Sequence, residues 1–331
     1  SKRATCISLG NRLYFTCDCG KLFLKNGDKY TETTLEEVTL PYAAHTFNKE
    51  EISDDTCVSE ATETVPQTFA KVCSVCGEKS PDQTFTYGKT LAEYASDDES
   101  LYTPSCVTTS LYDAENCVYG FTWNTESAPA RPILKIVDTA SGKETVLRAR
   151  FEEQNSYKRE NGGDIGIKYY VCKAEIELSP DATYTYSVGD KYFENTFTKI
   201  TQIKTVKPKE SAKWTFVHVS DSQVAENASG SEPATGIGTG EAFSKVLKQV
   251  ADLPDMRFLV HTGDVVEYSK YQSYWKYMLD YNFDYLSKLP VMAISGNHET
   301  TYRNGSNETY NRFDYKIPEQ NTEKGFYYSF S

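Results

Sequence analysis

Three polar residues that could bind metal ions lie far apart in the second half of the chain. Asp264 follows Asp221 by 43 residues, and Asn297 follows Asp264 by 33. Carboxylate and amide oxygens are hard ligands that suit ions such as Zn, Mn or Fe. A carboxylate shared by two ions can also hold them at the separation that two-metal hydrolysis needs. These residue types therefore predict a metal centre capable of hydrolysis.

The neighbours of these residues fit the same chemistry. Gly263 and Gly296 directly precede Asp264 and Asn297, and glycine permits tight turns close to the ions. His298 follows Asn297, where an imidazole could contact a phosphate group or protonate a leaving oxygen. The polar clusters thus combine candidate ligands, tight turns and a candidate proton donor.

The predicted elements bring these clusters together. Strands are expected over 214–220, 257–262 and 290–295, with helices over 241–251 and 269–289, the first helix from its apolar residues at three- and four-residue spacing. This alternation favours a mainly parallel sheet with right-handed crossovers. Each strand ends just before one polar cluster, and sites in such sheets lie beyond the carboxyl ends of the strands. The three clusters are therefore expected to converge.

The run 296–299, Gly-Asn-His-Glu, follows a strand and has Asp221 and Asp264 ahead of it. This order resembles the calcineurin-like metallophosphoesterase superfamily. The resemblance implies an enzyme that hydrolyses phosphate esters of a small-molecule substrate by a two-metal hydroxide mechanism. It further implies that Asp221 binds the first metal, that Asp264 bridges both, that Asn297 binds the second, and that His298 assists the leaving group.

Two positions depart from the family pattern. Gln223 stands where many members have histidine, and Glu267 stands three residues after Asp264, where purple acid phosphatases have tyrosine. Tyr268 lies one residue further on. Gln223 and Glu267 are therefore further candidate ligands, the identity of the first metal stays open, and the purple colour of an iron–tyrosinate site is not expected.

A larger departure concerns histidine. The resemblance implies three more histidine ligands, the last two in a Gly-His-x-His run, but no histidine follows His298. His218 and His261 lie within strands and are expected to pack in the core or to support the ligands. Residues 211–331 are thus expected to be the N-terminal, incomplete part of the domain, and this chain to be weakly active or inactive. The alternative is a non-catalytic cell-surface or adhesion protein with a degenerate or incomplete phosphoesterase domain.

Residues 101–207 predict a β-sandwich of the fibronectin III or Ig-like kind. Strand patterns occur over 118–123, 133–137 and 169–178, and a turn then leads into the Tyr-x-Tyr-x-Val strand 184–188, a corner typical of such sandwiches. The segment resembles the N-terminal sandwich of purple acid phosphatases and their bacterial relatives. Three cysteines in this range are expected to be buried thiols or to include one disulfide: Cys106, Cys117 and Cys172.

Residues 1–90 are expected to form two Cys-rich units. In each, a lone cysteine is followed by a cysteine pair and a glycine. The units carry, in order, Cys6, Cys17 and Cys19, then Cys57, Cys73 and Cys76. They resemble the short Cys-rich repeats of surface proteins of Gram-positive bacteria, which favours a secreted or cell-surface location.

A structural zinc site is one interpretation of these cysteines, because thiolates and an imidazole can form a tetrahedral ligand set. The second unit would use His45, Cys57, Cys73 and Cys76. The first unit would use Cys6, Cys17 and Cys19 with the same histidine, and one histidine cannot serve both. Disulfides are the alternative outside the cell.

The composition and net charge limit the kinds of partner that the chain is expected to bind. The 331 residues carry a formal net charge of −12, which argues against a nucleic-acid or anionic-membrane surface, since both require clustered Lys and Arg. No run of 18 apolar residues and no apolar signal segment is found. Together the patterns predict a multi-domain α+β chain: small Cys-rich repeats, a β-sandwich, and then the first part of an α/β metallophosphoesterase sandwich. The oligomeric state stays open.

Overall fold

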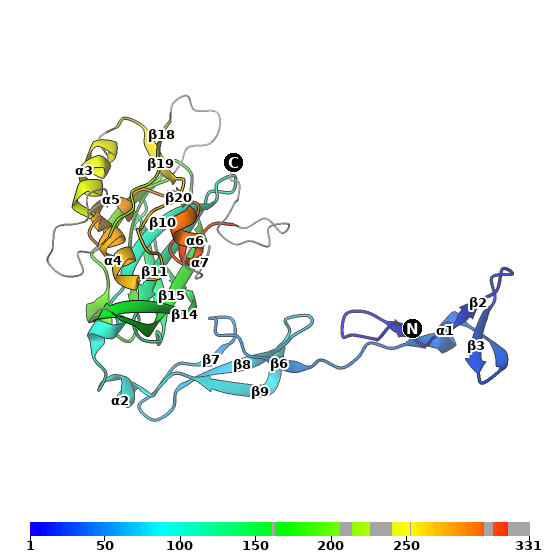
Figure 1. Cartoon of the computed structure of the whole chain (residues 1–331). Coiled ribbons are helices and arrows are strands. Elements are labelled where there is room, and N and C mark those ends of the chain that lie inside the picture. The colour runs from blue at the N-terminus through cyan, green and yellow to red at the C-terminus, as the bar shows by residue number, and fades with distance from the viewer. Residues whose placement is uncertain (161–162, 206–213, 226–239, 252, 301–306, 317–331) are drawn as a thin grey trace. The chain divides into compact units, whose positions relative to one another are not determined.

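The computed structural model describes residues 1–160, 163–205, 214–225, 240–251, 253–300 and 307–316. The chain divides into two compact units, residues 1–96 and 97–331 (Figure 1). Parts of the predicted domains, among them 206–213, 226–239, 301–306 and 317–331, lie outside the described residues. Among the described residues, every helix is too short or too polar to cross a lipid bilayer.

The first unit is built from short antiparallel pairs. Its first part holds β1 (Gly10–Asn11), β2 (Phe15–Thr16), β3 (Leu22–Asn26), β4 (Lys29–Thr33), α1 (Leu35–Val38) and β5 (Thr39–Leu40). Its second part holds β6 (Phe47–Lys49), β7 (Cys57–Ser59), β8 (Gln67–Cys73), β9 (Lys79–Tyr87) and α2 (Leu91–Tyr94). In that second part β8 lies between β6 and β7 and also pairs with β9.

Two four-stranded antiparallel sheets follow in the second unit, after the 3-10 turn η1 (Glu99–Tyr102). One has the order β10 (Ser105–Asp113), β11 (Val118–Thr125), β15 (Gly163–Glu177) and β14 (Arg150–Glu160). The other has the order β13 (Glu144–Arg148), β12 (Pro132–Asp138), β16 (Thr183–Asp190) and β17 (Thr201–Lys204), with the 3-10 turn η2 (Glu194–Thr196) before β17. All eight strands lie inside the range predicted for the sandwich.

The two sheets share one hydrophobic core. The rings of Phe121 on β11 and Tyr186 on β16 have centroids 4.8 Å apart, and both side chains are buried. Tyr184 accepts a hydrogen bond at its hydroxyl from the Ser179 N–H at 3.0 Å, which is the contact expected of a tyrosine corner. The fibronectin-like kind of the sandwich stays a prediction. Its three cysteines are buried free thiols, as one of the two expectations had it: Cys106, Cys117 and Cys172.

A parallel sheet of order β18 (Thr215–Val219), β19 (Met256–His261) and β20 (Val291–Ala293) completes the second unit. Its helices are α3 (Gly240–Ala251), α4 (Gln272–Leu279), α5 (Phe283–Leu286), α6 (Asn297–Thr300) and α7 (Asn307–Tyr310). The predicted βαβαβ order is confirmed. In Figure 1, α4 lies beside β10 of the sandwich, and β10 also contacts β20.

One predicted helix was wrong. The segment 269–289 is not a single helix, because α4 ends at Leu279 and α5 begins at Phe283. Asn282 lies in the break, fully buried, and its amide group donates to the carbonyls of Met278 at 2.8 Å and Gly240 at 3.3 Å. A buried amide that bonds to backbone carbonyls competes with continuation of the helix.

Asp280 at the end of α4 supports a prediction on pH. Its Oδ1 accepts a hydrogen bond from the Cys106 N–H at 2.5 Å. Burial raises the pKa of Asp280 from 3.8 to about 6, against the Cys106 N–H and the cations Lys276 and Arg312, which lower it. The folded state therefore binds this proton more tightly than the unfolded chain. The stabilisation of the folded state by protonated Asp280 is complete below about pH 3.8 and is lost as the pH rises through about 6.

We expect Asp280→Asn to flatten this pH dependence while keeping the acceptor oxygen. The wild type should lose about 1–3 kcal/mol more unfolding free energy than the variant between about pH 4 and about pH 7. Urea denaturation across this range measures the difference. The exposed Glu241 provides the control variant Glu241→Gln, which should keep the wild-type slope. Equal slopes for Asp280→Asn and the wild type would contradict the prediction.

Candidate metal centre

The loops after β18 and β19 run side by side. Asp221 N–H donates to the Gly263 carbonyl at 3.1 Å, and Gln223 N–H donates to the Asp264 carbonyl at 2.8 Å. A parallel bridge between Val224 and Val266 continues the pairing. The carboxyl ends of the two strands thus place the first and second polar clusters next to each other, as parallel pairing predicts.

Three of these loop residues have a left-handed backbone. Asp221 has φ 55°, Gln223 has φ 38° and Asp264 has φ 53°. Each such conformation costs a non-glycine residue about 1 kcal/mol or more and persists only where the surroundings enforce it. Strain of this kind concentrates at binding and catalytic sites, and here it falls on two of the three predicted ligands and on the candidate ligand Gln223.

The glycines let the second and third loops touch. A Cβ on Gly263 would lie 2.4 Å from the Gly296 nitrogen, and one on Gly296 would lie 2.2 Å from Asp264 Oδ1. Gly263 also has φ 103°, which favours glycine on its own. The predicted role of both glycines, a close approach of backbone to the site, is therefore what these contacts require.

Glu299 connects the same two loops through hydrogen bonds. Its side chain is fully buried, and its two carboxylate oxygens accept hydrogen bonds from four backbone N–H groups. The donors are Gly296 at 2.8 Å, Asp264 at 2.8 Å, Val265 at 2.9 Å and Val266 at 3.3 Å. Burial raises the pKa of Glu299, against the N–H groups, which lower it.

Sequence reasoning gave Glu299 no role in the site. Glu299 is the third residue of α6 and bonds back to the N–H of Gly296, which precedes the helix. This is the glutamate half of a capping box, whose three-residue spacing is a signal visible in the sequence. The three N–H groups from the other loop, by contrast, are brought within reach only by the fold.

His298 is held by both neighbouring loops. Its backbone N–H donates to Asp264 Oδ1 at 2.9 Å, Nδ1 lies 2.8 Å from the Glu267 carbonyl, and Nε2 lies 3.0 Å from the Gln223 side-chain nitrogen. In the neutral ring, Nδ1–H donates to Glu267 and Nε2 accepts from Gln223. Burial disfavours the charged ring, but the carbonyl and carboxylate of Glu267 and the carboxylates of Asp264 and Glu299 outweigh burial and raise the pKa of His298.

The two other histidines near the site differ from each other. His261 is buried, accepts the Gly263 N–H at Nδ1 over 3.3 Å, and bonds through Nε2 to Ser222 Oγ at 2.9 Å. Burial lowers the pKa of His261 to about 4, so the ring is neutral and supports both loops, as predicted. His218 is exposed and bonds to Thr262 Oγ1 at 2.8 Å, so packing in the core is wrong for this residue.

The predicted ligands fit metal ions by their chemistry. Asp221 and Asn297 are exposed and Asp264 is buried, while Gln223 and Glu267 are half-buried. Among the described residues, no Lys or Arg forms an ion pair with Asp221 or Asp264, although both are acidic and held in neighbouring loops. Two such carboxylates and an amide are a donor set for hard cations. We call Asp221, Asp264, Asn297 and His298 the strand-end site.

The structure groups the cysteines of the first unit differently from both predicted sets. The ligand atoms of Cys6, His45, Cys73 and Cys76 all lie within 4.8 Å of one another. We call these four residues the Cys/His cluster. Cys57 is not among them, because it pairs with Phe69 on β8, about 14 Å along the strand from Cys73 at 3.4 Å per residue.

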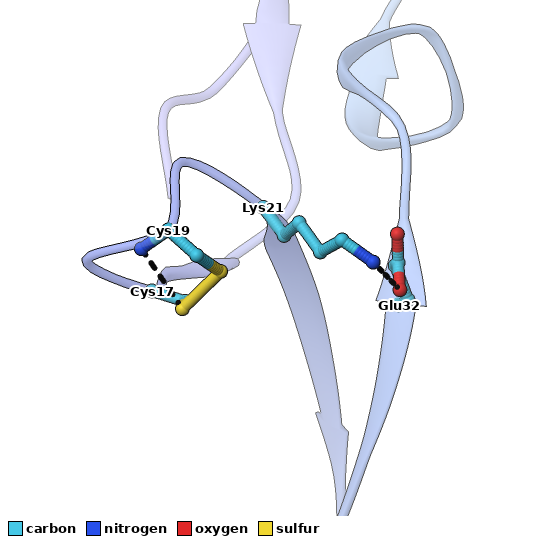
Figure 2. Close-up of a disulfide and its surroundings, with 4 residues drawn as sticks. All are labelled: Cys17, Cys19, Lys21 and Glu32. Atoms are coloured by element: carbon cyan, nitrogen blue, oxygen red, sulfur yellow. Dashed lines mark hydrogen bonds and ion pairs between the residues drawn. A yellow bond between two sulfur atoms is a disulfide. The ribbon is translucent and has the colours of Figure 1, made fainter.

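Cys6 takes the place predicted for Cys57. The Thr5 carbonyl accepts the Ala43 N–H at 3.0 Å, which holds the N-terminal segment against the chain near His45. Cys17 and Cys19 form a disulfide with each other, so the predicted set of the first unit is not assembled. Figure 2 shows this disulfide beside the 2.9 Å ion pair of Lys21 and Glu32.

Comparison with known proteins adds a family for one part of the chain. Residues 215–330 match the family model "Calcineurin-like phosphoesterase". The structure is similar to purple acid phosphatase PPD1 from yellow lupin (Lupinus luteus) seeds, with a TM-score of 0.54 and 19% identity. That similarity covers 79% of this chain and 47% of the lupin chain, so this chain spans about half the length of that protein.

Two further comparisons add nothing to the fold. A pullulanase from Anoxybacillus sp. LM18-11 aligns over 75% of this chain and 34% of its own at 12% identity, but its TM-score of 0.14 carries no argument. No curated protein matches the sequence. The strand-end site lies wholly inside the matched segment, and the chain therefore carries, at residues 215–330, a domain of the calcineurin-like phosphoesterase family.

Proposed function

We propose that the protein hydrolyses phosphate esters of a small molecule with two metal ions at the strand-end site. The observation that carries the proposal is the meeting of three strand-end loops inside the segment that matches the phosphoesterase family. Two carboxylates, one amide and one imidazole lie in those loops. Zn, Mn and Fe are the ions that such ligands suit best.

The residues divide the work by their chemistry. Asp221, Asp264 and Asn297 would hold the ions, with Gln223 and Glu267 as additional ligands. When bound, the ions supply charge neutralisation at the phosphate and a water of lowered pKa. His298 Nδ1–H is occupied by the Glu267 carbonyl. In the protonated ring, Nε2–H would therefore carry the proton that goes to the leaving oxygen, in place of the hydrogen bond that neutral Nε2 accepts from Gln223.

Turnover by the 331-residue chain itself is expected to be weak or absent. The family completes its site with three further histidines, and the sequence contains none after His298. Fewer ligands hold a second ion less tightly, and two-metal chemistry needs both ions in place. If each chain bound two metal ions equally tightly, this expectation would be contradicted.

Asp264→Asn provides the direct test. In the intact protein, we expect the substitution to lower hydrolysis of p-nitrophenyl phosphate by at least about 100-fold, because one carboxylate that would hold the ions is lost. Metal content, measured on the same samples, should fall with it. The matched control is Asp284→Asn, since Asp284 is exposed and pairs with Lys199; that variant should keep wild-type activity. Unchanged activity and metal content in Asp264→Asn would refute the proposal.

The second candidate function is a non-catalytic cell-surface or adhesion protein, as the Cys-rich first unit and the missing histidines would allow. A natural protein that binds metal but shows no hydrolysis of any phosphomonoester or phosphodiester would favour it. A secreted or cell-surface location belongs to both proposals, and detection of the protein only inside intact cells would oppose it. The phosphorylated small-molecule substrate and the lack of a nucleic-acid surface stay predictions as well.

A further inference from the structure

We propose that Cys6, His45, Cys73 and Cys76 hold one structural zinc ion that ties the N-terminal segment to the β8–β9 hairpin. Three thiolates and one imidazole are a set that closed, four-coordinate zinc sites use. The inference is independent of phosphoester hydrolysis, because none of these residues belongs to the strand-end site.

The spacing of the ligand atoms matches a tetrahedron around zinc. With Zn–S bonds of about 2.3 Å and Zn–N bonds of about 2.0–2.1 Å, the edges of such a tetrahedron measure about 3.5–3.8 Å. Cys6 Sγ lies 3.7 Å from Cys73 Sγ, and Cys76 Sγ lies 3.3 Å from His45 Nδ1. All four ligand atoms lie within 4.8 Å of one another. The side chains are thus already arranged around a common centre.

The turn between Cys73 and Cys76 is shaped for thiolate ligands. Gly77 has φ 77° and donates its N–H to the Cys73 carbonyl at 2.8 Å, which closes the turn. The backbone N–H groups of Val75 and Cys76 point at Cys73 Sγ. N–H donors of this kind spread the charge of a metal-bound thiolate and fix its direction.

His45 is oriented by a partner on its far side. While Nδ1 faces Cys76 Sγ, Nε2 lies 3.2 Å from Glu78 Oε2. A carboxylate that accepts the second ring N–H fixes the tautomer and makes the first nitrogen a better ligand. Phe47 stacks on the ring with centroids 5.7 Å apart. The imidazole is therefore held with Nδ1 toward the three sulfurs.

A metal ion would stabilise the first unit, which has little hydrophobic core. Residues 1–96, all of which are described, bury few apolar side chains: Val38, Ala61, Phe69, Ala70, Val72, Cys73 and Tyr94. Small units with little core usually rely on disulfides or metals for stability. An ion at the Cys/His cluster would join Cys6 to Cys73 across 67 residues. With four protein ligands it would have no open position for catalysis.

Cobalt distinguishes this centre from the strand-end site. The full chain is prepared under reducing conditions, stripped of metal and titrated with Co²⁺. A site with three thiolates should show sulfur-to-cobalt charge-transfer absorption, whereas an oxygen-ligand site cannot. We expect one equivalent of Co²⁺ to produce this band, and one equivalent of Zn²⁺ to remove it, because zinc binds such ligands more tightly.

Cys57, the ligand that was predicted from the sequence in place of Cys6, provides the control variant. Cys6→Ser should weaken zinc binding by at least 100-fold, and Cys57→Ser should leave it unchanged. Glu78→Gln keeps all four ligands and the fold, and should weaken binding 10- to 100-fold. This variant keeps the test decisive if Cys6→Ser does not fold.

Three results would overturn the proposal. The first is the lack of a charge-transfer band in the reduced wild type. The second is equal loss of zinc from Cys57→Ser and Cys6→Ser. The third is a Cys6–Cys73 disulfide, found by mass spectrometry in protein isolated with its thiols blocked, since a disulfide would consume two of the four ligands.

Discussion

Glu299→Ala is expected to lower the free energy of unfolding by about 3 kcal/mol or more and to abolish metal binding at the strand-end site. The carboxylate accepts four backbone N–H groups from two loops. Removal of a buried acceptor leaves each donor unsatisfied, at about 1–3 kcal/mol for a fully buried group. Because the same hydrogen bonds fix the backbone of Asp264, the Asp264 carboxylate would also lose its position.

Chemical denaturation and calorimetric titration with Mn²⁺ measure the two effects. Glu299→Gln should lie between the wild type and Glu299→Ala, because it keeps one acceptor oxygen but presents an NH₂ group to the remaining donors. Glu241→Ala is the control, since Glu241 is exposed and pairs, among the described residues, with Lys245 in an i,i+4 contact. That change should stay within about 0.5 kcal/mol. Wild-type metal affinity in Glu299→Ala would show that the carboxylate does not position the site.

Arg312→Met is expected to destabilise the second unit by about 3–5 kcal/mol. Arg312 is fully buried, and its guanidinium donates to Tyr169 at 2.9 Å and Gln272 at 2.5 Å. It also pairs with buried Glu308 at 3.3 Å. The substitution would leave the Glu308 carboxylate without its cation in a site that excludes water, which is the costly way to break a buried pair.

Unfolding monitored by tryptophan fluorescence would measure this loss, since Trp275 packs 5.2 Å from the guanidinium. Arg312→Met combined with Glu308→Gln should recover part of the loss, because the stranded charge is gone. Lys316→Met is the control: Lys316 is exposed and pairs with Asp113 at 2.7 Å, a contact worth about 1 kcal/mol or less. A similar loss of unfolding free energy in Arg312→Met and Lys316→Met would contradict this prediction.

The sandwich and the parallel sheet share one compact unit through this buried network. Sequence patterns predicted both elements but not their junction. Arg312 belongs to a segment for which the sequence patterns predicted no element, and its partners Tyr169 and Gln272 lie 143 and 40 residues away. Contacts across such distances leave no local signal, because they arise only when separate elements pack together.

The meeting of the strand-end loops was predictable because its signals are local. A strand, a glycine and a polar residue within a few positions indicate a loop at the carboxyl end of a sheet, and parallel order then predicts convergence. Asp264, Asn297 and His298 belong to such runs, and the loop after β18 carries Asp221. Glu299 belongs to the same Gly-Asn-His-Glu run, but its contacts were not predicted, since three of its four donors belong to a different loop.

The cysteines show what only the tertiary structure decided. Their residue types indicate a thiolate and imidazole site, and the set predicted for the second unit contains three of the four residues of the Cys/His cluster: His45, Cys73 and Cys76. The choice of the fourth residue depends on strand register. Pairing of β7 with β8 carries Cys57 away from the turn, while the Thr5–Ala43 hydrogen bond carries Cys6 toward it. Spacing in the chain cannot choose between two cysteines when backbone pairing sets their distance in space.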